Sequence, residues 1–536
     1  MLGLKTMKIS TIRHVIVTLL FAAVLLLSEG CSSVFVPYEV GNRTKEKSYS
    51  GGGTTLARLF YAVNTAHPEL SGAYLLDKGE ESLLWRGVLT EQAEKSIDIQ
   101  TFIWSDDNVG TIGAARLLQA AKRGVRVRVL LDYVTLDVDS DYLVWLNDHP
   151  NITIRLYNPF SQLDASIGSK VSTLLSSFSR LNRRMHNKLF LVDGRVVLLG
   201  GRNNADEYYD MHADMNFRDR DLLVVGDVLQ EARRGFDEYW NSEWSISIDQ
   251  VLPRKVDLQQ RTAYYRKLES YARDQKNYPP RFDDALKRIR ESLQRLPGRL
   301  SWGKAEMIYD IPGKNEQLSS LRGYGKSGEF LSRSILEAEQ EILVETPYMI
   351  TMPGTLDIFT RLQEQGVLVR VLTDSMASAE DDLVFSAYKR QRRNILRRGV
   401  KICELRRDAD LRDTVFERFQ NMEEMPGISL HAKTAVIDRR TLLIGSFNLD
   451  PRSTHINTEH VFRIESPELA EQVAKIINTD MDLENCWQIN MDAEGKLTWK
   501  TLRDGREDIS HIEPDVTFFE RMRLLFFMML PVEAIL

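Results

Sequence analysis

The sequence predicts an α/β protein in which two homologous domains with mixed, largely parallel sheets follow one another along the chain. Two segments, residues 95–104 and 340–349, match each other and alternate between apolar and polar side chains as strands do. In both copies a helix-prone stretch follows, and then a glycine and a second strand within residues 123–132 and 365–374. A helix that ends at a glycine between two strands is typical of a parallel strand pair.

The spacing within the two copies supports a duplication. Ile97 lies 89 residues before His186, and Ile342 lies 89 residues before His431. Equal spacing over that length favours two homologous domains over chance. The expected layout is a signal peptide (1–30), a tether and N-terminal segment (31–70), a first domain (71–250), a helical connector (251–300), a second domain (301–500) and a C-terminal apolar helix (501–536).

Composition excludes several classes of protein. The chain has 536 residues, of which 43% are apolar and 27% charged, and these values exclude a disordered, collagenous or coiled-coil chain. A net charge of -6 argues against a protein that coats nucleic acid. Cys31, Cys403 and Cys486 cannot form a disulfide scaffold, and their spacing fits no zinc site. We expect Cys403 and Cys486 to be buried thiols.

The N-terminus has the pattern of an export signal. Basic residues precede an apolar run over residues 15–27, which suits a signal-peptide core and is short for a membrane span. Small residues before Cys31 resemble a bacterial lipoprotein cleavage site. Lipidation of Cys31, simple cleavage and an uncleaved anchor all remain open. The expected location is the bacterial cell envelope, in association with the membrane.

Each copy carries the same pattern of chemically active residues. The pattern is HxKxxxxD, and two small residues and xN follow it further along the chain. A histidine and a lysine two residues apart on a strand point to the same face. The motif residues are His186, Lys188, Asp193 and Asn203 in the first copy and His431, Lys433, Asp438 and Asn448 in the second.

These motifs resemble the HKD motifs of the phospholipase D superfamily. Residues 178–188, 200–203, 445–454 and 530–533 further resemble its cardiolipin synthase C branch, although an export segment departs from that branch. The resemblance implies two tandem phospholipase D-like α/β domains, packed face to face around one shared active site. It also implies a covalent phosphohistidine. No cofactor is needed for that chemistry, and the sequence shows no carboxylate cage for a metal.

Each residue type has a task in this chemistry. We expect His186 to be the nucleophile and His431 the general acid and base, with the reverse assignment open. Asp193 and Asp438 belong to the catalytic motifs, and we expect them to act structurally by pairing with nearby backbone or charge. The residues expected to hold the phosphate oxygens are Lys188, Lys433, Asn203, Asn448 and Ser446. Each histidine should have a carboxylate that orients it: Glu459 in the second copy, which matches the family pattern, and Asp219 in the first, favoured over Asp221.

The function implied by the resemblance is a phosphatidyltransferase. It would make cardiolipin from phosphatidylglycerol and a second phospholipid, which could be phosphatidylethanolamine. Hydrolysis by a phospholipase D is the alternative, and an envelope nuclease is less favoured because no nucleic acid partner is expected. The membrane surface is an expected partner, since residues 518–530 form an apolar stretch with a basic edge, suited either to an interfacial helix or to a helix packed on the core. A small helper protein remains an open possibility.

Overall fold

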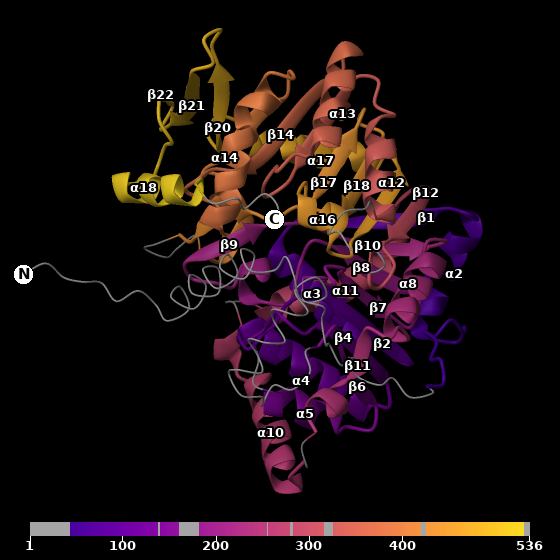
Figure 1. Ribbon diagram of the computed structural model, residues 1–536. Helices are drawn as coiled ribbons and strands as arrows, with labels where there is room; N and C mark the ends of the chain where they lie inside the picture. Colours follow the sequence, from indigo (N-terminus) through magenta and orange to yellow (C-terminus); the bar gives the residue numbers. More distant parts are fainter. Residues whose placement is uncertain are drawn as a thin grey trace, which may run out of the picture.

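The computed structural model describes residues 43–529 apart from residues 138–139, 160–181, 254–255, 279–281, 316–324 and 420–424. The expected signal peptide and Cys31 lie outside the described residues. Figure 1 shows two lobes, the first repeat in indigo to magenta below and the second in orange to yellow above. The site discussed below lies where the two lobes meet.

A mixed sheet forms the centre of the first repeat. Three neighbouring strands, β2, β4 and β6, run parallel, and the other neighbours pair antiparallel. The parallel part is thus the strand–helix–strand region that the sequence predicts. Across the sheet the strands are β12 (Ser301–Tyr309), β1 (Ser71–Leu76), β10 (Asp221–Gly226), β8 (Val196–Gly200), β7 (Leu189–Val192), β2 (Ser96–Thr101), β4 (Arg126–Asp132), β6 (Ile152–Tyr157) and β11 (Ser245–Ser247).

The second repeat contains an equivalent sheet. Here β13, β14 and β15 are the parallel strands, and β12 is shared, because it pairs with β1 on one side and with β19 on the other. Across this sheet the strands are β12, β19 (His460–Glu465), β18 (Thr441–Gly445), β17 (Thr434–Ile437), β13 (Glu341–Glu345), β14 (Leu368–Asp374), β15 (Lys401–Leu405), β20 (Cys486–Met491), β21 (Leu497–Arg503) and β22 (Arg506–Ser510).

Helices cover the sheets on both faces. The two glycines predicted to end a helix before β4 and β14, Gly124 and Gly366, have φ values of 94° and 77°, which favour glycine. The helices are α2 (Thr55–Ala66), α3 (Gly79–Gln92), α4 (Asn108–Lys122), α5 (Ser140–Asn147), α8 (Leu229–Trp240), α9 (Ile248–Val251), α10 (Leu258–Tyr271), α11 (Phe282–Arg295), α12 (Lys326–Ile335), α13 (Pro353–Glu364), α14 (Asp382–Leu396), α15 (Arg412–Val415), α16 (Pro451–His455), α17 (Pro467–Asp480) and α18 (Phe518–Phe527).

The two repeats share one apolar core. Side chains from the facing sides of both sheets form a single buried cluster, to which helices α8 and α17 also contribute. Leu191 and Leu222 enter it from the first repeat, and Val436 and Ile464 from the second. Because this core belongs to both repeats, it fixes the two sheets face to face, as the resemblance implies.

Two short strands connect the repeats beside this core. Strand β9 (Met215–Arg218) pairs in parallel with β16 (Gly427–Leu430). A single bridge between Met185 and Thr458 makes the equivalent connection on the other side. Each of these four segments leads directly into a residue of the expected site.

Some segments differ from the expected layout in detail. Residues 43–53 of the expected tether lie against the first repeat, where the Ser48 amide donates to Asp237 (2.8 Å). Residues 501–510 of the expected C-terminal helix belong largely to strands β21 and β22. Helix α18 packs on α14 through the fully buried Leu524, while much of its surface is exposed. Helices α10 and α11 of the connector pack on α4 and α3.

The expectation of two free thiols is wrong. Cys403 on β15 and Cys486 on β20 form a disulfide, with their Cα atoms 5.7 Å apart. The two strands are neighbours in the sheet, and Leu405 lies opposite Cys486. A separation of 83 positions along the chain conceals this proximity in the sequence.

Candidate active site

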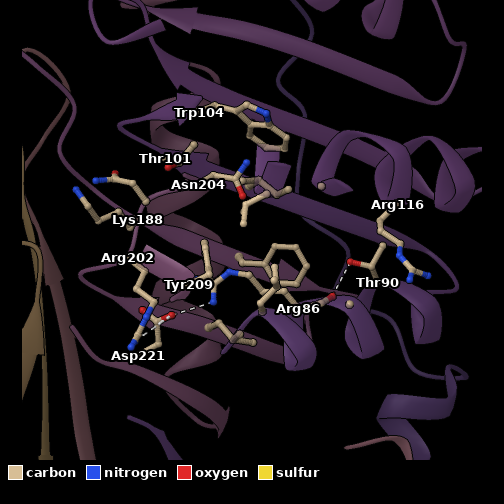
Figure 2. Close-up of a pocket in the computed structure, with 18 of the residues that line it drawn as sticks. Arg86, Thr90, Thr101, Trp104, Arg116, Lys188, Arg202, Asn204, Tyr209 and Asp221 are labelled. Carbon is tan, nitrogen blue, oxygen red and sulfur yellow. Dashed lines mark hydrogen bonds and ion pairs between the residues drawn. The ribbon is translucent and has the colours of Figure 1, made fainter. Parts of the chain in front are cut away.

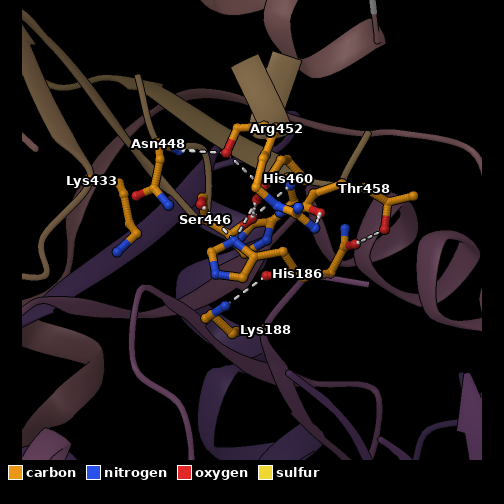
Figure 3. A network of polar contacts seen from close by, with 12 residues as sticks. His186, Lys188, Lys433, Ser446, Asn448, Arg452, Thr458 and His460 are labelled. Carbon is orange, nitrogen blue, oxygen red and sulfur yellow. Dashed lines mark hydrogen bonds and ion pairs between the residues drawn. The ribbon is translucent and has the colours of Figure 1, made fainter. Parts of the chain in front are cut away.

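His186 is held by residues of the other repeat. Its Nδ1 lies 2.9 Å from Glu459 Oε2 and 3.0 Å from the Ser446 carbonyl oxygen. Its backbone amide donates to the Thr458 carbonyl (2.9 Å), through the bridge that joins the repeats. The Glu459 carboxylate is fully buried, so it fixes the ring and the proton on Nδ1. This leaves Nε2 as the nitrogen for chemistry, and Figure 3 shows the network.

His431 is held in the same way by the first repeat. Its Nδ1 lies 2.7 Å from Asp219 Oδ2. Its backbone amide donates to the Arg218 carbonyl (2.9 Å), at the end of the β9–β16 pair. The Tyr208 hydroxyl lies 3.4 Å from His431 Nε2. Each histidine therefore takes a carbonyl and the next residue's carboxylate from the opposite repeat.

The surroundings of the two carboxylates differ. The Ser446 hydroxyl donates to Glu459 (2.5 Å) and accepts from the His460 amide (3.0 Å), so it serves Glu459 and is not turned towards a phosphate. The equivalent residue beside Asp219 is Gly201. A Cβ on Gly201 would lie 2.3 Å from Asp219 Oδ1, so this position needs glycine for the carboxylate to fit.

The two motif lysines lie between the histidines and the sheets. Lys188 Nζ donates to the His186 carbonyl (2.7 Å), and Lys433 Nζ donates to the His431 carbonyl (2.5 Å). Both side chains are nearly inaccessible to solvent. Burial lowers the pKa of Lys188 to about 7 and that of Lys433 to about 8, against the opposing effect of Glu459 and Asp219.

Burial also controls the charge on the histidines. It lowers the pKa of His186 and of His431 well below the usual range, and Lys188 and Lys433 lower both further. Burial raises the pKa of Glu459 to about 7 and also raises that of Asp219. Both imidazoles are consequently neutral near pH 7 before an anion enters, which is the form a nucleophile requires.

The two asparagines lie beside the histidines with tyrosine partners. Asn203 Nδ2 donates to the Tyr208 hydroxyl (2.7 Å), and Asn448 Nδ2 donates to the Tyr348 hydroxyl (3.0 Å). The Asn448 Oδ1 is buried and makes no hydrogen bond in the described part of the chain. Tyr208, the partner of Asn203, also lies 3.4 Å from His431 Nε2.

Asp193 and Asp438 lie away from the histidines. Asp193 follows the far end of β7, and its carboxylate accepts from the backbone amides of residues 94–96 (2.7–3.3 Å). Asp438 accepts from the amides of residues 339–341 (2.8–2.9 Å) at the matching place. Each one ties the turn after its motif strand to the start of the neighbouring strand.

Several residues of the site were not predicted from the sequence. Asp132 accepts from the Met185 amide (2.8 Å), and Asp374 accepts from the Leu430 amide (2.9 Å), so each positions the residue before a motif histidine. The sequence contained a hint of this role, because Asp132 and Asp374 end the second strands of the two copies, at matching positions. Tyr208 and Tyr348 carried no such signal, since they occupy unmatched positions in the two copies. The expectation that each carboxylate serves the histidine of its own copy is wrong, because Glu459 holds His186 and Asp219 holds His431.

Each repeat has a mixed sheet that brings one His–Lys pair to the place where the two repeats meet. This arrangement defines a protein that transfers or hydrolyses phosphodiesters. A family model described as "Cardiolipin synthase, PLD-like domain" matches residues 89–240 and 331–481. The chain therefore belongs to the phospholipase D superfamily. The resemblance expected from the HKD motifs is confirmed.

Relatives and solved structures agree with this family. The chain is 34% identical to cardiolipin synthase C of Escherichia coli over 495 residues, which cover 90% of this chain and 99% of the relative. It is 31% identical to an uncharacterised protein of Helicobacter pylori, over 89% and 91% of the two chains. The crystal structure of phosphatidylserine synthase from Haemophilus influenzae has the same fold, with a TM-score of 0.55, 15% identity and coverage of 90% and 100%.

Proposed function

We propose that this protein is a phosphatidyltransferase that joins two phospholipids into cardiolipin through a phosphohistidine. The observation that carries the proposal is the pair of neutral, buried histidines, each with Nδ1 held by a carboxylate of the other repeat. A phosphodiester between them meets a nucleophile on one side and a proton donor on the other. The relatives named cardiolipin synthase support this choice of substrate.

The first step transfers a phosphatidyl group to the enzyme. His186 Nε2 attacks the phosphorus of phosphatidylglycerol, and the bond from phosphorus to the headgroup glycerol oxygen breaks. His431, which takes up a proton on Nε2 as the anionic lipid binds, donates that proton to the leaving glycerol oxygen. The phosphate anion offsets the charges of Lys188 and Lys433, which raises the pKa of His431 towards the range of a general acid. Asn203 and Asn448 hold the oxygens on which charge develops.

The second step releases cardiolipin. The headgroup hydroxyl of a second phosphatidylglycerol gives its proton to His431, and its oxygen attacks the phosphorus while the bond to His186 breaks. The Tyr208 hydroxyl near His431 Nε2 favours His431 for this exchange of protons, since it offers a polar partner on the reacting nitrogen. If water takes the place of the second lipid, the product is phosphatidic acid.

The proposal includes a place in the bacterial envelope at a membrane surface. Large apolar side chains are exposed along α18 and just after it, with Phe519 82% and Met529 75% accessible, and these support contact with a bilayer. The Cys403–Cys486 disulfide supports an oxidising compartment, in line with an export signal. In the described part of the chain, no helix is both long enough and apolar enough to span a membrane.

The test uses the purified protein in detergent with labelled phosphatidylglycerol, with and without phosphatidylethanolamine. We expect labelled cardiolipin from the wild type and at least a thousandfold loss in His186→Ala and in His431→Ala, about the effect of removing a member of a catalytic unit. Dependence of the product on phosphatidylethanolamine would identify the second lipid as a substrate.

The structure also offers a matched control. His212→Ala removes a histidine near the first motif in sequence whose ring accepts from local backbone amides, and it should retain activity. Phosphatidic acid as the sole product would replace the synthase with a hydrolase. Absence of any lipid turnover would contradict the proposal for the isolated chain and direct the search to a partner protein.

A further inference from the structure

Each repeat contains a cavity behind its half of the active site. In the first repeat the cavity lies between the outer face of β2, β7 and β8 and the helices α3 and α4. In the second repeat a cavity lies between β13 and the helices α12 and α13, and a smaller one adjoins it beside β17 and β18. Figure 2 shows the first cavity, with Lys188 at one end and Arg116 at the other.

The linings of the two cavities correspond along the chain. The offset between the repeats is 245 residues, as it is from His186 to His431. It relates the α3 lining to the α12 lining position by position, so the cavities are a repeated feature of the fold. The matched residues are Leu83, Arg86, Gly87 and Thr90 in the first repeat and Gly328, Leu331, Ser332 and Ile335 in the second.

Both cavities reach the active site at a motif lysine. Lys188 and Asn203, two of the residues expected to hold the phosphate oxygens, line the first cavity. Lys433 lines the smaller cavity of the second repeat, which shares Leu331 and Phe447 with the larger one. Each repeat thus has a residue expected to contact the phosphate in the wall of a cavity behind its sheet.

The chemistry of the linings fits a hydrocarbon. In the second repeat Leu331, Ile335 and Phe447 occupy the positions of Arg86, Thr90 and Arg202. In the first repeat the charges are internally paired: Arg86 binds Asp221 (2.8 Å), and Arg202 donates to the Tyr208 carbonyl (2.9 Å). Most other lining side chains are aliphatic or aromatic, as in sites for apolar ligands.

We propose that each cavity holds an acyl chain of one of the two phospholipids that react. The inference rests on the proposed function, because only a lipid places hydrocarbon chains a few bonds from the phosphate. Two equivalent cavities match a reaction between two lipids, whereas hydrolysis needs one. The residues of α3 and α12 that face the cavities then determine which lengths of acyl chain the protein accepts.

The test fills the cavities at matched positions with Gly87→Met and Ser332→Met. A Cβ on Gly87 would lie 3.8 Å from Leu286, so the backbone accepts a side chain and its further atoms occupy the cavity. For each variant, kcat/KM is measured with dioleoyl and dihexanoyl phosphatidylglycerol. We expect the ratio of long-chain to short-chain kcat/KM to fall about tenfold, the effect of a few methylene groups on pocket fit.

Two control variants distinguish the effect of filling a cavity from general damage to the protein. Gln92→Met on α3 and Arg333→Met on α12 lie outside the linings and should leave the ratio unchanged. An equal loss with both chain lengths, or an unchanged ratio in both filled variants, would overturn the inference. The ratio remains informative if the product is phosphatidic acid, when only the proposed function fails.

A second readout does not depend on turnover. Retention of dioleoyl phosphatidylglycerol is measured by native mass spectrometry on His186→Ala, alone and combined with Gly87→Met or Ser332→Met. Filling a cavity should reduce the bound lipid. Full retention in both combined variants would show that the chains lie elsewhere.

Discussion

At the scale of single residues, burial shifts the pKa of the histidines, carboxylates and lysines of the site towards their neutral forms. Both histidines have a lowered pKa and both orienting carboxylates a raised one, because neither charged form is well solvated there. The lysines supply the positive potential, yet burial brings their own pKa close to neutral pH. The site is therefore poised to change its charge when an anionic lipid enters.

A narrow dependence on pH follows from these shifts. Towards acid pH, kcat/KM should fall as Glu459, with a pKa of about 7, and Asp219 take up protons. Towards alkaline pH it should fall as Lys188 and Lys433 lose their charge, from pH 7 to 8 upwards. Arginine does not titrate in this range, so Lys188→Arg, which replaces the lysine of lower pKa, should move the alkaline limb to higher pH.

The measurement is kcat/KM for phosphatidylglycerol between pH 5 and pH 10, since this quantity reports the free enzyme. Wild type, Lys188→Arg and Lys433→Arg are compared, and circular dichroism establishes that all three are folded. If both folded arginine variants keep the wild-type alkaline limb, the lysines are not its origin.

At the scale of elements, the disulfide reinforces the outer part of the second sheet. It joins β15 to β20, beyond which only β21 and β22 continue the sheet. Replacing both cysteines by serine should lower the free energy of unfolding by about 2–4 kcal/mol, the usual effect of losing a disulfide of this kind. Chemical denaturation of wild type and Cys403→Ser/Cys486→Ser measures the difference.

Reductant serves as the control for this prediction. It should destabilise the wild type to about the level of the double variant and leave the double variant unaffected. A wild type whose unfolding is the same with and without reductant would contradict the prediction.

The elements also show what sequence reasoning can reach. The period of the strands, the glycines before β4 and β14 and the repeated HxKxxxxD motif identified both sheets and both His–Lys pairs, because these are local patterns. The cysteine pair, the shared strand β12 and the two tyrosines depend on contacts between distant segments. The carboxylates Asp219 and Glu459 could be named from the sequence. Their histidine partners could not, because each carboxylate meets the histidine of the other repeat where the strand ends of the two repeats come together.

At the scale of the whole molecule, exposed apolar side chains gather at one place. Eight of the thirteen large apolar side chains that are exposed in the described chain lie between residues 509 and 529. They are Ile509, Ile512, Phe518, Phe519, Met522, Leu525, Phe526 and Met529. A patch of this kind on a soluble surface marks a contact with a membrane or another molecule.

Removal of this patch should weaken binding to vesicles of phosphatidylglycerol. We expect Phe519→Ser/Met529→Ser to bind at least tenfold more weakly in a sedimentation assay, since two large apolar side chains no longer enter the bilayer interface. Tyr61→Ser is the matched control, because Tyr61 is 71% exposed on α2, outside the patch. Equal binding of the double variant and the control would exclude α18 as the membrane contact.

The two repeats are also joined by a buried network of charges. Arg218 and Arg220 of the first repeat bind Asp480 of the second at 2.8 and 3.1 Å, and Arg220 also contacts Glu345. The same segment carries Asp219, which orients His431. A change that loosens this contact between repeats is therefore expected to loosen His431 as well.

The exchange of carboxylates between the repeats governs how the site responds to dilution. Two separate half-enzymes would lose the partner of each histidine whenever they dissociated, and activity would fall faster than concentration. Here one chain carries both halves, and strand β12 belongs to both sheets. Each carboxylate thus stays at a high effective concentration next to its histidine. A single copy of the chain can hold a complete site however dilute it becomes.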